Sequence, residues 1–189
     1  MNKIDLTVVI GHYQEDLNWL KQLKHKHVIY NKNPEKEGKY HFDLPNYGWD
    51  TIVYLTYIID NYNNLPDFVC FSQDDPFGHS KDFITEVNNF DGSTQFLSLG
   101  KNYVRDNEDL VKLTKKYADS VNIKYSKVLK FISGAQCIVS KELILKNSKE
   151  FYEKIRESIP KQRISWDINY YIEYLWPTIL NFNEELTIS

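Results

Sequence analysis

Short apolar runs alternate with segments of helical period along the 189-residue chain, and this alternation constrains the fold more than any other feature. The runs at residues 6–10, 27–30 and 68–72 are each closed by polar turn residues, which predicts three strands. Between them, apolar side chains recur at helical spacing in residues 15–23 and again from about residue 50. This order of elements predicts right-handed crossovers between parallel strands. We therefore expect an α/β fold with a mostly parallel, Rossmann-like sheet flanked by helices.

The second half of the chain continues this pattern, with an apolar stretch at 128–139 that is split by Ser133 and Gly134. No internal repeat and no linker divides the sequence, so a single domain over residues 1–189 is expected. The further elements expected are a strand at 95–99, helices at 108–117 and 167–180, and one helix that Ser140 caps and that runs to about residue 157.

Composition and charge exclude several classes of protein. Hydrophobic residues make up 42% of the chain and aromatic residues 15%, with a net charge of −3, so intrinsic disorder is excluded. Lys and Arg number 23 against 26 Asp and Glu, and the chain therefore lacks the positive field on which non-specific nucleic-acid binding depends. We expect no nucleic-acid partner.

Cysteine usage and hydropathy bear on the compartment. Cys70 and Cys137 each lie inside an apolar run, where buried, unreactive thiols are found, so no disulfide framework is expected. No signal-like segment opens the sequence, and no apolar stretch approaches the roughly 20 residues of a membrane span. These features predict a cytoplasmic protein without a membrane span.

Ligands of open α/β sheets bind beyond the carboxyl ends of the strands, and the segment 71–79 is the most informative one of this kind. Adjacent carboxylates at Asp74 and Asp75 directly follow a predicted buried strand, which suits a divalent cation such as Mn²⁺ or Mg²⁺. His79 is a possible further ligand. The alternative is that Asp75 before Pro76 starts a turn that Asp74 caps.

Two helices carry further candidate residues. Asp50 lies at the start of the second predicted helix, where an acid favoured by the helix dipole is a sufficient explanation. In the last helix, Trp166, Asn169 and Glu173 share a face that points away from the apolar stripe. Glu173 is therefore either solvated or directed into a cleft, and Asp167 is a competing carboxylate at the helix N-cap.

Several motifs in this order resemble an uncharacterised family of glycosyltransferase-A-type domains. The chain is also similar in size and motif order to glycosyltransferase domains that large DNA viruses use on capsid glycans, so the host cytoplasm is the expected location if its source is viral. The motifs span nearly the whole chain. They are residues 8–20, 29–32, 44–48, 54–55, 59–62, 65–67, Phe71, Gln73, Pro76, His79, residues 133–136, residues 151–152 and residues 173–176.

The resemblance implies a metal-dependent transferase that moves a sugar from a nucleotide diphosphate-sugar, UDP-sugar first, to a glycan or a protein-linked sugar. Asp74, Asp75 and His79 are then assigned to the metal and the diphosphate. Glu173 is the first choice for the catalytic residue and Asp167 the second. The nucleotide is expected at Gly11, His12, Tyr13, Asn31, Lys32 and Asp50, and the acceptor at Ser133, Gly134, Gln136 and Trp166.

The second interpretation is a non-catalytic carbohydrate-binding or nucleotide-binding module on the same scaffold. In that case the segment from Asp74 to Pro76 is only a turn. Phosphate-loop, zinc-site and Gly-x-Ser-x-Gly patterns are absent from the sequence, which removes the main support for kinase, metalloprotease and α/β-hydrolase functions.

Overall fold

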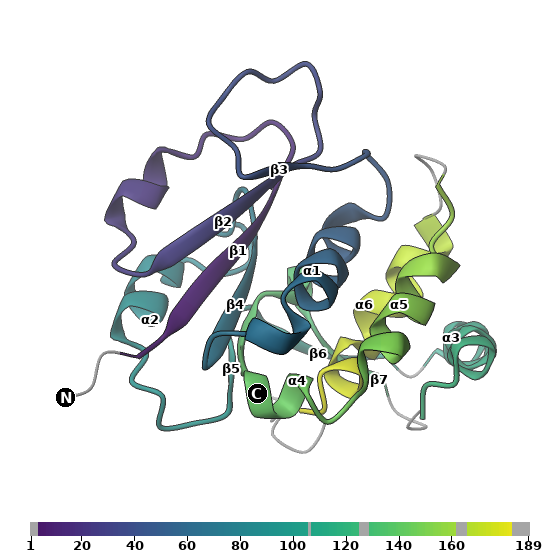
Figure 1. Cartoon of the computed structure of the whole chain (residues 1–189). Helices are drawn as coiled ribbons and strands as arrows, with labels where there is room; N and C mark the ends of the chain where they lie inside the picture. The colour runs from purple at the N-terminus through teal and green to yellow at the C-terminus, as the bar shows by residue number, and fades with distance from the viewer. Residues whose placement is uncertain (1–3, 106, 125–128, 162–165, 183–189) are drawn as a thin grey trace.

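The computed structural model describes residues 4–105, 107–124, 129–161 and 166–182 (Figure 1). Four of these residues, Arg105, Leu129, Trp166 and Asp167, are described by their backbone only. In these ranges the chain is an α/β structure with a mainly parallel sheet flanked by helices, as the alternation of apolar runs predicts.

The main sheet has six strands in the order β3-β2-β1-β4-β8-β5. The strands β1, β2, β3 and β4 run parallel to one another, whereas β8 runs antiparallel to both β4 and β5. Their bounds are β1 Leu6–His12, β2 Lys26–Asn31, β3 Phe42–Asp43, β4 Phe68–Gln73, β5 Phe96–Ser98 and β8 Cys137–Ser140.

The central strand β1 is buried on both faces, which explains why its sequence reads as a continuous apolar run. Val9 packs into the core on one face, while Val8 and Ile10 pack into the core on the other. Cys70 and Cys137 are buried and are not joined in a disulfide, as their apolar surroundings predict.

Helices cover both faces of the sheet (Figure 1). On one side lie α1 (Trp49–Asp60), α5 (Lys149–Ser158) and α6 (Trp166–Ile179), and α3 (Glu108–Val121) packs against α6. On the other side lie α2 (Phe83–Asn89) and the short 3₁₀ helix η1 (Asn18–Gln22). The remaining elements are η2 Tyr62–Asn64, β6 Asn102–Arg105, β7 Leu129–Ile132, η3 Ser133–Ala135 and α4 Lys141–Ile144.

The helix predicted at 15–23 is wrong in extent. Only η1 forms there, and the Asp16 carboxylate accepts hydrogen bonds from the Asn18 backbone and side-chain amides just ahead of it. An Asp side chain that bonds two residues ahead stabilises a turn in competition with a helix. The leucines whose spacing predicts the helix, Leu17, Leu20 and Leu23, still pack on the core.

The single helix predicted from Ser140 to about residue 157 is also wrong, because two helices share this segment. Ser140 does cap α4, since its hydroxyl accepts from the Leu143 amide at 3.2 Å. The helix then ends, and Ser148 caps α5 by accepting from the Phe151 amide at 3.4 Å. A second capping serine thus divides what helical spacing alone joins.

Two features of the second half are absent from the prediction. The strand β6 pairs with β7 in a separate two-stranded antiparallel sheet, and β7 packs against α6.

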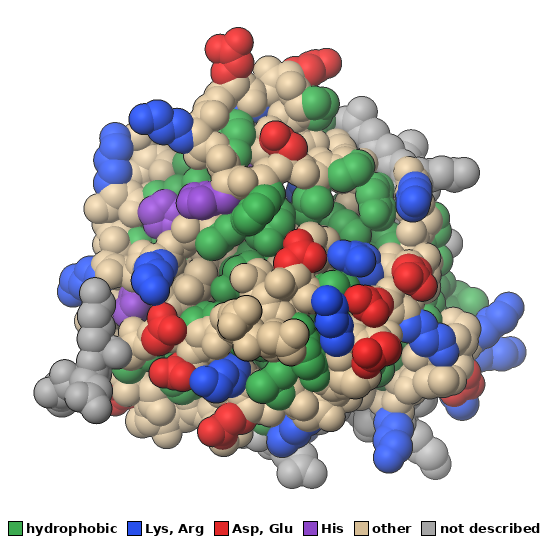
Figure 2. Space-filling model, viewed as in Figure 1, with side chains coloured by type: hydrophobic (Ala, Val, Ile, Leu, Met, Phe, Trp, Pro, Cys, Tyr) green, Lys and Arg blue, Asp and Glu red, His purple; other side chains and the backbone are tan. Residues whose placement is uncertain are grey.

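Acidic and basic side chains are interspersed on the face shown in Figure 2. Among the residues that the structure describes, no helix is long and apolar enough to cross a membrane.

Candidate functional site

Two cavities open where β1, β2 and β4 reach their carboxyl ends, and they share the side chains of Trp49, Asp50 and Gln73. The first, which we call the lysine cavity, has a volume of about 320 Å³, and the second, the histidine cavity, about 300 Å³. The lysine cavity is further lined by Gly11, Tyr13, Lys32, Asn46, Asp74 and Asp75. The histidine cavity is further lined by Tyr54, His79, Ser133, Gly134, Tyr170 and Glu173, among others.

Asp50 connects the strand ends in the wall between the cavities. Its Oδ1 lies 3.6 Å from Lys32 Nζ, and its Oδ2 accepts a hydrogen bond from Gln73 Nε2 at 3.0 Å. The carboxylate lies against Gly11, where a Cβ atom would overlap Oδ1. Asp50 therefore does more than complement a helix dipole, because it pairs with a lysine that is only 7% exposed.

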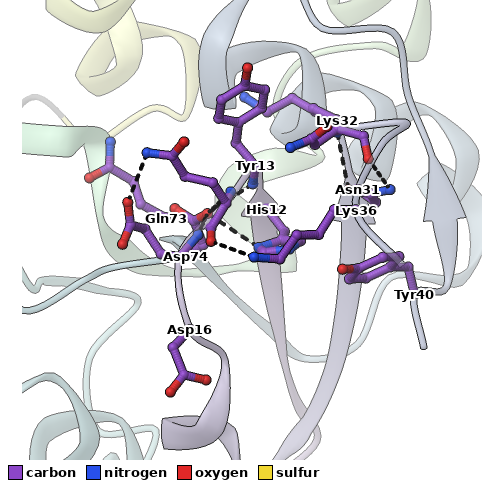
Figure 3. A network of polar contacts seen from close by, with 12 residues as sticks. His12, Tyr13, Asp16, Asn31, Lys32, Lys36, Tyr40, Gln73 and Asp74 are labelled. Carbon is purple, nitrogen blue, oxygen red and sulfur yellow. Dashed lines mark hydrogen bonds and ion pairs between the residues drawn. The ribbon is translucent and has the colours of Figure 1, made fainter. Parts of the chain in front are cut away.

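Asp74 holds the loop that follows β1. Its Oδ2 accepts hydrogen bonds from the backbone amides of Tyr13, Gln14 and Glu15 at 2.8, 3.1 and 3.1 Å, and His12 Nδ1 lies 3.2 Å away (Figure 3). Burial raises the pKa of Asp74, but these amides and His12 outweigh it, and the net pKa is lowered. The carboxylate is thus kept ionised as a backbone anchor.

Asp75 differs from its neighbour, because it is exposed at the rim of the lysine cavity. Its Oδ1 accepts from the Phe77 amide at 3.2 Å, as in the predicted Asp-Pro turn. His79 lines the histidine cavity, so the three predicted metal ligands are divided between the two cavities. Within the described ranges, no group of three His, Cys, Asp or Glu side chains has the arrangement of a metal site.

The lysine cavity can hold a divalent ion in one way, by a protein carboxylate together with phosphate oxygens of a bound molecule. Mg²⁺ and Mn²⁺ are commonly held by one or two carboxylates together with substrate phosphates, and Asp75 can supply such a carboxylate. The lysine cavity is lined by three carboxylates, Asp50, Asp74 and Asp75, and by one ammonium group, Lys32. A diphosphate that enters it needs further positive charge, which a bound cation would provide.

The histidine cavity contains a hydrogen-bonded pair from distant parts of the chain. Ser133 Oγ lies 2.7 Å from His79 Nδ1. Ser133 opens η3, in which Gly134 and Ala135 have the left-handed φ values 68° and 51°. Glu173 Oε1 accepts from the Gly134 amide at 3.3 Å. The turn, the imidazole and the carboxylate therefore meet in one cavity.

Aromatic side chains form another wall of the histidine cavity. Trp49 and Tyr170 pack edge to face with ring centroids 5.0 Å apart. Trp49 itself has a φ of 46°, a conformation that is uncommon for a bulky residue. Left-handed backbone at both Trp49 and Ala135 places two strained positions on this cavity, and such positions concentrate at functional sites.

A protein-family model described as "Protein of unknown function (DUF3431)" matches residues 7–107. The chain belongs to the DUF3431 family. No curated protein matches the chain. The DUF3431 match includes every residue of the lysine cavity and also His79, whereas Ser133, Gly134 and Glu173 lie beyond it.

The residues expected to bind a nucleotide fall into two groups in this DUF3431 protein. Gly11, Tyr13, Lys32 and Asp50 meet in the lysine cavity. His12 and Asn31 do not line this cavity. His12 packs on Tyr40 on the opposite side of β1 (Figure 3), and the Asn31 side chain donates to Asn33 O and Asp43 Oδ1.

The residues expected at the acceptor and in catalysis are also divided. Ser133, Gly134 and Glu173 meet in the histidine cavity. Gln136 is fully buried and donates to Pro76 O at 3.1 Å, which ties the turn after β7 to the turn after β4. Trp166 and Asp167 open α6, but their side chains lie outside those that the structure describes.

Three contributions to the site are absent from the sequence prediction. They are the Gln73 bond to Asp50, the pairing of His79 with Ser133, and Tyr54 in the floor of the histidine cavity. Tyr54 follows Asp50 by four residues on the same helix, a spacing that places both on one face and provides a sequence signal. The other two join segments whose proximity no local pattern indicates.

Proposed function

We propose that this DUF3431 protein is a glycosyltransferase that moves a sugar from a nucleotide diphosphate-sugar to a glycan or a protein-linked sugar. The first donor to test is a UDP-sugar. The observation that carries the proposal is the pair of adjoining cavities at the carboxyl edge of the sheet, which meet at Asp50 and Gln73. The lysine cavity offers the Lys32 ammonium to a diphosphate, and the histidine cavity offers the rings of Trp49 and Tyr170 to a sugar. The motif resemblance to glycosyltransferase-A-type domains supports the same reaction.

The lysine cavity is the proposed site of the nucleoside diphosphate. The Lys32 ammonium is buried there beside Asp50, so it is held in place for a phosphate oxygen. Asp75 would hold a Mn²⁺ or Mg²⁺ ion together with the phosphates, and this metal would stabilise the charge on the leaving diphosphate. The Tyr13 ring lines the same cavity and offers a face for the base or the ribose.

The histidine cavity is the proposed site of the transferred sugar and the acceptor hydroxyl. Rings of Trp49 and Tyr170 provide the apolar surface on which a sugar ring packs. Glu173 provides a carboxylate in the same cavity and remains the first catalytic candidate from the sequence. No protein residue needs to form a covalent bond to the sugar in an inverting transfer, because the acceptor oxygen attacks directly.

A non-catalytic nucleotide-binding or carbohydrate-binding module is the second candidate function. It is favoured by the structural use of both carboxylates, since Asp74 anchors the loop 13–15 and Asp75 accepts a turn hydrogen bond from the Phe77 amide. In this case the same cavities bind a sugar nucleotide but release no product.

Calorimetry with UDP and UDP-hexoses, with and without Mn²⁺, tests the proposal together with an assay for released UDP. We expect Mn²⁺-dependent binding and UDP release, both lost in Asp75→Ala. Asp91→Ala is the matched control, because Asp91 also caps a turn two residues ahead, at the Ser93 amide, and lines neither cavity. Binding without UDP release from any donor favours the module, and native-like binding by Asp75→Ala overturns the metal assignment.

A further inference from the structure

The His79 ring is held in the histidine cavity by one hydrogen bond. Its Nδ1 lies 2.7 Å from Ser133 Oγ, and no other hydrogen bond to the ring is formed within the described part of the chain. His79 is an exposed residue and lines the histidine cavity, and Nε2 is the ring nitrogen that Ser133 does not contact. A histidine whose orientation is set through one nitrogen and whose other nitrogen faces a substrate is the usual arrangement for proton transfer.

Gly134 allows the turn and the imidazole to come this close. A Cβ atom at residue 134 would lie 2.7 Å from His79 Cδ2, which is shorter than real contacts of this kind. The φ of 68° at Gly134 also favours glycine. Both the backbone conformation and the missing side chain are therefore required for Ser133 to reach Nδ1.

From this geometry we infer that His79 takes the proton of the acceptor hydroxyl, with Ser133 as the positioning residue that sets the ring. The inference rests on the proposed glycosyl transfer and adds a general base to it. This base is His79, which the sequence analysis assigns to the metal. When Nδ1 donates its hydrogen to Ser133 Oγ, the lone pair of Nε2 is directed to the substrate. Ser133 directly follows β7, as the first residue of η3.

The proposed transfer forms one bond and breaks one bond at the anomeric carbon of the donor sugar. The acceptor O–H proton moves to Nε2 of His79 while the acceptor oxygen forms a bond to the anomeric carbon. The bond between that carbon and the diphosphate oxygen breaks, and the nucleoside diphosphate leaves with its electron pair. The imidazolium then returns its proton to solvent. No oxidant, reductant or further reactant is required.

Glu173 has a different role in this arrangement. Its Oε1 accepts from the Gly134 amide at 3.3 Å, so it supports the same turn that presents Ser133. This contact is separate from the hydrogen bond between Ser133 and His79. The two candidates for the base, His79 and Glu173, are therefore separable by mutation.

The test compares His79→Gln, Ser133→Ala and Glu173→Gln in the same UDP-release assay, with UDP affinity measured by calorimetry. We expect His79→Gln to lower turnover about 100-fold or more. UDP affinity is expected to change less than about two-fold, because His79 does not line the lysine cavity. Ser133→Ala is expected to lose about 10-fold in turnover and Ser133→Thr to recover it, because Thr keeps the hydroxyl. His27→Gln, on a histidine at the start of β2, is the matched control.

The outcomes separate the inference from the proposed function. Turnover of His79→Gln within about three-fold of the native protein, with Glu173→Gln inactive, overturns the inference and leaves the transferase proposal intact. Parallel loss of UDP affinity and turnover in both His79→Gln and Ser133→Ala also overturns it, because a structural role is then sufficient. If the native protein binds no UDP and releases none from any donor, both proposals fail.

Discussion

The Lys32 ammonium lies 3.6 Å from the Asp50 carboxylate, and this ion pair connects the end of β2 to the first turn of α1. Gln73 at the end of β4 donates to the same carboxylate, and Gly11 in β1 provides the space in which it lies. Four elements of the fold therefore converge on one acidic side chain. The position of Lys32 in the lysine cavity depends on all of them.

Gly11→Ala tests this convergence. The new methyl group would overlap Asp50 Oδ1, so we expect displacement of Asp50 and weaker UDP binding, by about 10-fold or more. The free energy of unfolding should fall by about 1–3 kcal/mol, as overpacking does elsewhere. Gly78→Ala is the control, because no atom lies within 4 Å of a Cβ at that position. Equal UDP affinity in the two variants would contradict the prediction.

Asp74→Ala and Asp75→Ala are expected to differ in stability although the residues are adjacent. Removal of the Asp74 carboxylate leaves the amides of residues 13–15 without their acceptor and should cost about 3 kcal/mol in the free energy of unfolding. Asp75 is exposed and accepts one turn bond, so its removal should cost less than about 1 kcal/mol. Urea unfolding at pH 7.5 measures both values, and equal losses would refute the anchoring role.

Stability is expected to fall as the pH is lowered below about 6.5. Burial lowers the pKa of His12 from its usual 6.5, against the opposite effect of Asp74, and burial also lowers the pKa of His27. The unfolded chain therefore binds protons at a higher pH than the folded chain, and stability present above pH 6.5 is lost as the pH falls through the folded pKa values. Urea unfolding at several pH values between 7.5 and 5 gives the free energy of unfolding as a function of pH. This free energy should fall less steeply with decreasing pH in a His12→Gln, His27→Gln double variant. An unchanged slope would rule out this origin.

The lowered pKa of Asp74 predicts a second loss at lower pH. Its contribution is present above the ordinary carboxyl value of 3.8 and is lost as the pH falls through the lower value in the folded protein. Acid unfolding followed by circular dichroism should therefore begin at a higher pH in Asp74→Ala than in the native protein, because the variant starts from a lower stability. Coincident acid transitions would contradict this expectation.

Two buried tyrosines should respond oppositely to loss of their hydroxyl groups. Within the described residues the Tyr54 hydroxyl has no hydrogen-bond partner, whereas the Tyr117 hydroxyl lies 2.7 Å from Ser158 Oγ. Tyr54→Phe removes a buried polar group without a partner and should leave stability unchanged or raise it by up to about 1 kcal/mol. Tyr117→Phe should cost about 1 kcal/mol. Thermal unfolding of the two variants measures the contrast, and a larger loss in Tyr54→Phe would reverse it.

Local patterns identify the elements where one physical effect dominates. The run that becomes β1 is apolar because both of its faces are buried, so hydrophobicity alone predicts it. The prediction that Ser140 caps a helix is confirmed. The N-terminal amides of a helix need acceptors, and a serine just before the helix supplies one. The extent of η1 and the division between α4 and α5 differ from the prediction, since side-chain bonds of Asp16 and Ser148 compete with helical spacing there.

The sequence by itself predicted the α/β class and pointed to the carboxyl edge of the sheet, where Gly11, Tyr13, Lys32 and Asp50 line one cavity while His12 and Asn31 do not. Only the tertiary structure decided that Asp74 anchors a backbone loop and that His79 pairs with Ser133 rather than with the neighbouring carboxylates. Short-range patterns report hydrophobic burial and capping, which act between residues close in the chain. A hydrogen bond between residues 54 positions apart depends on how β4 and β7 pack, and that is a property of the whole fold.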